Sequence, residues 1–325
     1  MIAQKCGVST ATVSRVLNNE PGVSAAKREY ILEVLKESGY TPPQPQKLSK
    51  IRKVGVILPY NTQDYYTSLL HALTIFFLKY DIQVVTCTTE RNLISLTDSL
   101  DTLYDCGVAG VIFISRDYLS VKNHLNPKIA HVWIDCNDPP EVTQEICQVQ
   151  SEQYTSGKMA ARELINKGCT QPIILTTFPE THRTKKRNRG FIEEFEQHGI
   201  EVGEDRIIHL PQIKDTFTES KERVRYLIYS NYPFDSVFAI SDWRALGAYA
   251  GVEETGKKVP DDIRIVGYDG VSLACRSVLN ITSIQQNVEL IAQTAGEQLM
   301  KLMNREEIKE KRIIIPTDIL QGQSV

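Results

Sequence analysis

Residues 9–18 read STATVSRVLN and combine short polar side chains with one arginine. Val16 and Leu17 lie three and four positions after Val13, so all three are expected to face inward from one side of a helix. The side chains left on the outside are those of Thr10, Ala11, Ser14, Arg15 and Asn18. This face suits the major groove of DNA, because arginine bonds guanine, methyl groups meet thymine, and short polar side chains hold phosphate.

The residues before this helix predict the turn that would position it. Gly7 can adopt the positive φ of a tight turn, and Ser9 can cap the helix by accepting a backbone N–H. A third helix is expected after Ser24, its predicted cap, with Tyr30 among the residues that pack back on the other two. The pattern predicts a helix-turn-helix domain over residues 1–40.

The charge is distributed unevenly along the chain. Residues 1–53 carry nine Lys and Arg against four Glu, a net charge of +5, so the other 272 residues must carry −8 to give the overall −3. A basic head on an acidic body favours a polyanionic partner for the head. Residues 41–53, TPPQPQKLSKIRK, predict a hinge or linker because proline interrupts helices. The cations of this segment either contact phosphate or are simply solvated.

From Val54 onward, apolar runs that suit buried strands alternate with amphipathic stretches that suit helices. KVGVILP, VAGVIFIS and IRIVGYD are of the first kind, and SLLHALTIFFLKYD and ALGAYAGVEETGK are of the second. The alternation predicts an α/β fold of parallel sheets flanked by helices. Roughly 270 residues exceed what one such sheet needs, so two lobes are expected. Ligands of such sheets bind beyond the carboxyl ends of the strands.

Signatures of catalysis, metal binding and membrane insertion are missing from the sequence. The seven cysteines are scattered without a CxxC pair, and the six histidines have no metal-binding spacing. There is no glycine-rich phosphate loop and no nucleophile elbow, so neither a metal nor a cofactor is expected and an enzyme is disfavoured. No apolar run of 18 residues and no signal segment is found, which predicts a cytoplasmic protein without a membrane span.

A set of motifs in series resembles one known family. GVSTATVSRVLNN closely resembles the DNA-binding head of the lactose-repressor (LacI/GalR) family of bacterial transcription regulators. RNRGFIEEFEQHGI, FAISDWRALGAYAGVEETGKKVPDDIRIVGYDG, ITSIQQN and IIIPTDIL are similar to successive motifs of the family core. The resemblance covers nearly the whole chain. It implies a helix-turn-helix head, a hinge over residues 41–53, and a two-lobed periplasmic-binding-protein-like core over residues 54–325.

The resemblance also implies lobe boundaries and partners. The N-lobe would comprise residues 54–151 and 287–313, and the C-lobe residues 152–284 and 316–325. Relatives act as homodimers or dimers of dimers on a near-palindromic operator, and each recognition helix reads one half-site. By position, the residues that would read bases are Thr10, Ala11 and Arg15. The residues that would position the DNA backbone are Ser9, Thr12, Ser14 and Asn18.

Two features of the head depart from the family pattern. The first helix of the family begins a few residues earlier, so the first helix here is expected to be truncated or its start to have been placed late. The hinge is short and proline-rich and lacks the usual Ala-Arg-Ser-Leu core. Leu48 is either the hydrophobic wedge that enters the minor groove in relatives or an ordinary linker residue.

The resemblance implies an effector site between the lobes, lined by carboxylates, an arginine and aromatic rings that suit a sugar. Its residues, by matching position, would be Asp64, Tyr65, Tyr66, Ser115, Asp135, Arg187, Phe217, Asp242, Asp269 and Gln286. Asp242 is also expected to cap the helix that follows it. Arg187 lies in the cationic run 183–189, so a solvated face or a phosphate-bearing ligand is an alternative role for it.

The expected function is therefore a repressor whose operator affinity responds to a sugar-like effector. Control by a protein partner or by a sugar phosphate is the alternative. A solute-binding protein with the same bilobal fold is a more distant one, because it would need a signal segment and would carry no helix-turn-helix.

Overall fold

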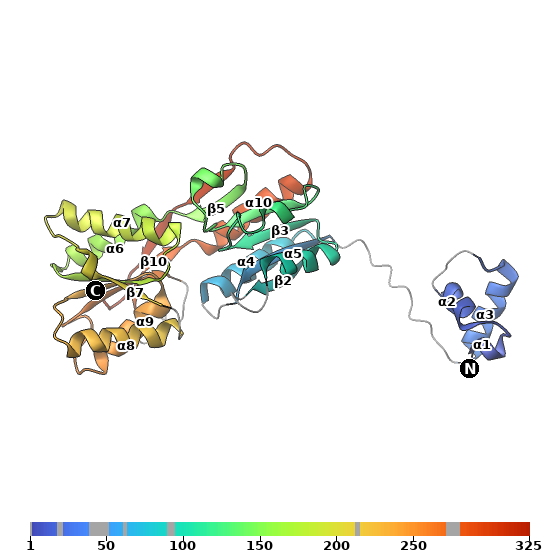
Figure 1. The fold of residues 1–325 in the computed structure, drawn as a ribbon, viewed down its shortest axis with the longest axis horizontal. Coiled ribbons are helices and arrows are strands. Elements are labelled where there is room, and N and C mark those ends of the chain that lie inside the picture. Colours follow the sequence, from blue (N-terminus) through green and yellow to red (C-terminus); the bar gives the residue numbers. More distant parts are fainter. Residues whose placement is uncertain are drawn as a thin grey trace. The chain divides into compact units, whose positions relative to one another are not determined.

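The structure, a computed structural model, describes residues 2–17, 22–38, 52–60, 64–89, 95–211, 215–270 and 280–325. The chain divides into two compact units, Met1–Ile51 and Arg52–Val325 (Figure 1). We refer to the first as the head and to the second as the core.

In residues 2–17 and 22–38, the described part of the head, lie three helices, α1 (Ile2–Lys5), α2 (Thr10–Leu17) and α3 (Ala25–Glu37). Gly7 has a φ of 62° in the turn between α1 and α2, a value that glycine adopts without strain. The N–H of Thr12 donates to Oγ of Ser9 over 3.2 Å, as expected of a helix cap. Val16, Ile31 and Leu35 are buried and form the centre of a small hydrophobic core.

Two details of the head differ from the sequence-based expectation. Ser24 has the extended backbone of a cap residue, but its side chain makes no capping hydrogen bond. Tyr30 is 51% exposed, whereas its neighbour Ile31 is fully buried. One residue along a helix turns the side chain by about 100°, so Ile31 and Leu35 take the inward positions and Tyr30 points to solvent.

The N-lobe of the core is built on a six-stranded sheet whose paired strands are all parallel. Across the sheet the strands are β11 (Arg312–Ile315), β5 (Cys147–Ser151), β4 (Ala130–Ile134), β3 (Gly110–Ile114), β1 (Lys53–Pro59) and β2 (Gln83–Thr89). Helices α4 (Asp64–Leu78) and α10 (Val288–Met303) pack on one face, and α5 (Leu96–Asp105) packs on the other. Alternate strand residues serve the two faces: Ile112 joins the first cluster and Phe113 the second.

The C-lobe has a second six-stranded sheet. Its strands, in order, are β12 (Thr317–Leu320), β10 (Thr282–Gln286), β9 (Arg264–Asp269), β8 (Ser236–Ala239), β6 (Pro172–Thr177) and β7 (Ile207–Leu210). All pairs are parallel except β12 with β10, an antiparallel edge that the sequence pattern did not predict. Helices α6 (Tyr154–Ile165) and α7 (His182–Gln197) cover one face, and α8 (Thr216–Tyr229) and α9 (Asp242–Glu253) cover the other (Figure 1).

Short 3-10 helices complete the core at η1 (Lys122–His124), η2 (Pro140–Val142) and η3 (Glu204–Arg206). The expected α/β class is confirmed: a helix-turn-helix head and two largely parallel sheets flanked by helices. The chain passes between the two sheets after β5, after β10 and after β11. The crossings after β5 and after β11 are tied together, since the N–H of Glu152 donates to the carbonyl oxygen of Ile315 over 2.8 Å. These crossings lie beside the lobe boundaries expected from the sequence. The exact lobe boundaries stay predictions.

Candidate functional site

The N-lobe half of the site lies at the carboxyl ends of β3 and β4. Ser115 and Asp135 directly follow these strands, and both have a positive φ, 49° and 53°. Helix α4 brings two phenols to them: the hydroxyl of Tyr65 donates to Oδ2 of Asp135 over 2.8 Å, and that of Tyr66 donates to Oγ of Ser115 over 3.4 Å. Left-handed backbone at non-glycine residues costs free energy, so its occurrence at both strand ends is typical of a functional site.

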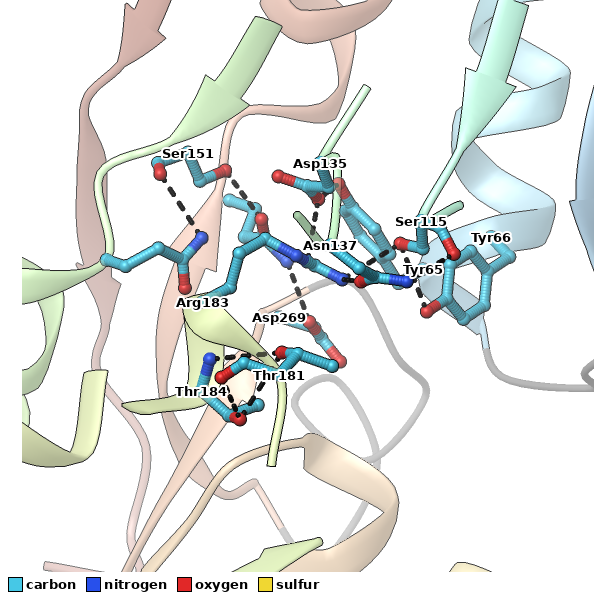
Figure 2. A network of polar contacts seen from close by, with 12 residues as sticks. Tyr65, Tyr66, Ser115, Asp135, Asn137, Ser151, Thr181, Arg183, Thr184 and Asp269 are labelled. Carbon is cyan, nitrogen blue, oxygen red and sulfur yellow. Dashed lines mark hydrogen bonds and ion pairs between the residues drawn. The ribbon is translucent and has the colours of Figure 1, made fainter. Parts of the chain in front are cut away.

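An arginine of the C-lobe completes this cluster, as Figure 2 shows. Arg183, in the first turns of α7, has its Nη1 3.3 Å from Oδ2 of Asp135. Its Nη2 donates to Oγ of Ser115 and to Oδ1 of Asn137, each over 3.1 Å. Neither Arg183 nor Asn137 was among the expected site residues. The sequence offered only their positions as a signal for them. Arg183 lies one helical turn before Arg187, and Asn137 lies two residues after Asp135.

Burial affects the protonation of Tyr65 in this half of the site. Burial, and after it the charge of Asp135, raises the pKa of Tyr65 well above its usual value. Tyr65 is therefore a protonated hydrogen-bond donor at any physiological pH. Asp135 itself is completely buried and receives its positive partner from the opposite lobe.

Arg187 anchors the C-lobe half of the site. Its Nε and Nη2 donate to Oε1 of Gln153 over 3.1 and 2.6 Å, and its Nη1 donates to the carbonyl oxygen of Ile240 over 2.6 Å. The guanidinium carbon lies 3.2 Å from the centre of the Tyr268 ring, which is close enough for a cation–π interaction. Gln153 belongs to the crossing after β5, so Arg187 is bound to a segment that joins the lobes.

Asp269 is connected to the same crossings. Gln286 donates through Nε2 to Oδ1 of Asp269 over 2.8 Å and accepts through Oε1 from the hydroxyl of Ser151 over 2.5 Å. Burial, and after it the charge of Asp242, raises the pKa of Asp269 well above the usual carboxyl value. A carboxyl with a raised pKa is more easily protonated, and it can then donate as well as accept a hydrogen bond.

Asp242 is not the cap of α9, so the capping role expected for it is wrong. The cap position is held by Ser241, and Asp242 is the first residue of the helix. Its carboxylate turns toward the sheet instead, where Oδ1 accepts from the hydroxyl of Ser283 over 2.6 Å and Oδ2 accepts from the N–H of Gly270 over 2.9 Å. These bonds hold the end of β9 against β10, and the residue is almost completely buried.

Two other expected residues lie at the beginnings of helices, Asp64 as the first residue of α4 and Phe217 as the second of α8, and both are half-buried. Arg244 was not expected at the site. It is buried beside the charges of Glu219 and Asp269, and burial, opposed by these two charges, lowers its pKa to about 10. The effector contacts assigned to these side chains stay predictions.

The DNA-reading positions lie on α2. Thr10, Ala11, Ser14 and Arg15 are exposed, as is Ser9, while Thr12 is half-buried and its hydroxyl is 2.9 Å from that of Ser9. The exposed face of α2 thus carries short, mostly polar side chains and one cationic side chain, that of Arg15, as the sequence suggested. Asn18 and Leu48 lie outside the described residues. The individual roles on DNA stay predictions.

Comparison with known proteins agrees with this architecture. Residues 2–43 match the model of the bacterial regulatory proteins, lacI family, and residues 161–325 match that of a periplasmic binding protein-like domain. The ribose operon repressor of Halalkalibacterium halodurans is 28% identical over 98% of this chain and 94% of its own length.

Solved structures show the same fold. A lac repressor dimer bound to operator and the anti-inducer ONPF has a TM-score of 0.73 at 20% identity, covering 99% of this chain and 97% of that one. A LacI family regulator from Enterococcus faecium with bound ribose has a TM-score of 0.73 at 20% identity, covering 84% of this chain and 98% of that one. This chain therefore combines a DNA-binding domain of the lacI family of bacterial regulatory proteins, over residues 2–43, with a periplasmic binding protein-like domain, whose model matches residues 161–325.

Proposed function

We propose that this chain is a transcriptional repressor that binds operator DNA and whose operator affinity changes when a sugar-like effector binds between the lobes of the core. The observation that carries the proposal is the cluster shared by the two lobes, in which Arg183 of the C-lobe contacts Ser115 and Asp135 of the N-lobe. A ligand that changes these contacts has different affinities for open and closed lobes, which is what coupling to DNA binding requires.

The chemistry of the site supports a hydroxyl-rich ligand. Carboxylates and arginines bond neighbouring hydroxyl groups, and aromatic rings cover the apolar face of a sugar. Tyr65, Asp135, Arg187 and Asp269 provide these groups from both lobes. The similarity to a ribose operon repressor, and to a regulator with bound ribose, makes D-ribose the first ligand to test.

On DNA, we propose that Thr10, Ala11 and Arg15 read base edges and that Ser9, Thr12, Ser14 and Asn18 hold phosphates. Leu48 is proposed as the minor-groove wedge. A homodimer would read a near-palindromic operator, as two-fold symmetry requires. Because the operator lies on the bacterial chromosome, we propose a cytoplasmic location.

Other functions have less support. Some relatives are named as repressors, and this favours a small effector over control by a protein partner or a sugar phosphate. The lacI-type head disfavours an exported solute-binding protein. We propose no catalytic role. In the described part of the chain, no group of three metal-ligating side chains could hold an ion. No described helix has both the length and the apolarity to cross a membrane.

The test begins with selection of an operator from random duplex DNA by the full chain. Gel-shift titration of that operator with and without D-ribose and a panel of other neutral sugars then measures the coupling. A sugar that changes operator affinity five-fold or more, about 1 kcal/mol, supports the proposal. Failure to select any sequence at moderate salt would refute the DNA-binding part, and selection without a response to any sugar would refute the effector part.

A further inference from the structure

Arg183 belongs to one lobe, but its side-chain partners belong to the other. It lies on α7 of the C-lobe, and its guanidinium contacts Asp135, Ser115 and Asn137 at the ends of N-lobe strands. Its side chain is only 13% exposed and that of Asp135 is fully buried. The ion pair therefore lies across the space between the lobes and holds them against each other (Figure 2).

Two of these partners, Ser115 and Asp135, are among the residues assigned to the effector site from the sequence. A buried carboxylate must be paired or hydrogen-bonded to be tolerated. Arg183 supplies that pairing from within the protein, together with the hydroxyl of Tyr65. An effector hydroxyl that bonds Oδ2 of Asp135 therefore competes with this arginine.

The ion pair is incompletely satisfied. Oδ1 of Asp135 and Nε of Arg183 are both buried and have no hydrogen-bond partner. Each would regain a partner from water if the lobes separated, so their burial weakens the closed arrangement. A contact of this kind can hold the lobes together and still be displaced by a ligand that satisfies more of the same atoms.

We propose that Arg183 is an internal occupant of the effector site: it closes the lobes of the ligand-free protein on Asp135, and the effector binds by displacing it. This inference rests on the proposed function for the identity of the site. It also defines the ligand class. Whatever replaces Arg183 on the buried Asp135 must donate hydrogen bonds, which hydroxyl groups do. A phosphate or carboxylate group would instead bring a like charge to Asp135.

Lobe closure can be tested without any ligand by small-angle X-ray scattering of the full chain. Arg183→Ala should increase the radius of gyration relative to the wild type, and Asp135→Asn, which removes the same ion pair from the other lobe, should do the same. Adding Arg183→Ala to Asp135→Asn should produce no further increase. Arg189→Ala is the matched control, because Arg189 is exposed on the same helix and pairs with Glu193 of that helix.

Two scattering results would overturn the inference. One is an unchanged radius of gyration in both Arg183→Ala and Asp135→Asn. The other is additive opening in the double variant, which would mean that the two residues act independently. Circular dichroism identifies a variant that fails to fold. If one single variant fails to fold, the radius of gyration of the other single variant decides whether the ion pair closes the lobes.

Titration with D-ribose tests displacement separately. If the arginine competes with the sugar, Arg183→Ala should bind D-ribose about tenfold more tightly than the wild type, equivalent to about 1.4 kcal/mol. Arg183→Lys should retain part of the competition. Weaker binding by Arg183→Ala would identify Arg183 as a direct ligand contact and overturn displacement. If no variant binds D-ribose, that sugar is excluded under the proposed function, and the scattering result still decides whether Arg183 closes the lobes.

Discussion

The hydroxyl of Ser151 donates to Oε1 of Gln286 over 2.5 Å, and this bond joins two of the segments by which the chain crosses between the lobes. The same Gln286 bonds Asp269, while Gln153, two residues after Ser151, bonds Arg187. Two of the C-lobe residues assigned to the effector, Arg187 and Asp269, are therefore connected to the crossings through side chains. A ligand that shifts Arg187 or Asp269 would act directly on the segments that join the lobes.

Ser151→Ala should lower the free energy of unfolding by about 1–3 kcal/mol, because it leaves the buried Oε1 of Gln286 without its donor. Urea denaturation followed by circular dichroism measures the change. Ser120→Ala is the control, since Ser120 bonds only a nearby carbonyl on the surface and its loss should cost less than about 0.5 kcal/mol. Equal effects of the two substitutions would contradict the role assigned to Ser151.

Arg187→Lys should be strongly destabilising, by about 2–4 kcal/mol, although the charge is conserved. A lysine cannot bond Gln153 through two nitrogens while it covers the Tyr268 ring. Arg189→Lys on the exposed side of α7 should change stability by no more than about 0.5 kcal/mol. A stability of Arg187→Lys close to that of the wild type would show that the planar guanidinium is not required.

Gly190→Ala should displace α7 from α6. A Cβ at Gly190 would lie 2.0 Å from the carbonyl oxygen of Tyr154, and backbone atoms cannot give way cheaply. The expected loss in free energy of unfolding is about 1–3 kcal/mol. Because Arg183 and Arg187 lie on α7, sugar binding should weaken as well. Glu196→Ala, at an exposed position of α7, is the control and should leave both stability and sugar binding unchanged. An unchanged free energy of unfolding in Gly190→Ala would contradict the close contact between α6 and α7.

Asp269 should make stability depend on pH. Its folded pKa is raised above the unfolded value, so protonated Asp269 favours the folded state. This contribution is complete below the unfolded carboxyl pKa, about 4, and is lost as the pH rises through the folded pKa. Asp269→Asn cannot ionise, so its stability relative to the wild type should increase from about pH 4 upward. A relative stability that falls with increasing pH would mean that the native state favours the ionised carboxylate.

Arg15→Ala should reduce base discrimination at one operator position by about 1–3 kcal/mol and leave the other positions nearly unchanged. Arg15 is exposed on α2, so its removal should not disturb the core of the head. Binding to a set of single-base operator variants measures the effect. Lys36→Ala on α3 is a comparison for loss of charge alone, since Lys36 is also exposed. A uniform loss across all variants would make Arg15 a phosphate contact instead.

The sequence by itself determined the local parts of this protein. The alternation of apolar strands such as KVGVILP with amphipathic helices fixed the α/β class, because burial on both faces of a parallel sheet demands that pattern. The cap at Ser9 and the exposed Arg15 also follow from local spacing along one helix. Ser115 and Asp135 directly follow strands and Asp269 ends one, at the edge where such sheets bind ligands, and the resemblance to the family assigned all three to the effector.

Tertiary structure alone decided which of several similar side chains meet. The run HRTKKRNR presents five cations with no local difference between them. Folding buries Arg183 against Asp135 and Arg187 against Tyr268, and it leaves Arg189 exposed. Asp242 likewise has the sequence position of a helix cap, yet it bonds Ser283, which is 41 residues away. Pairings over such separations depend on how the sheets and helices pack, and no local pattern encodes that.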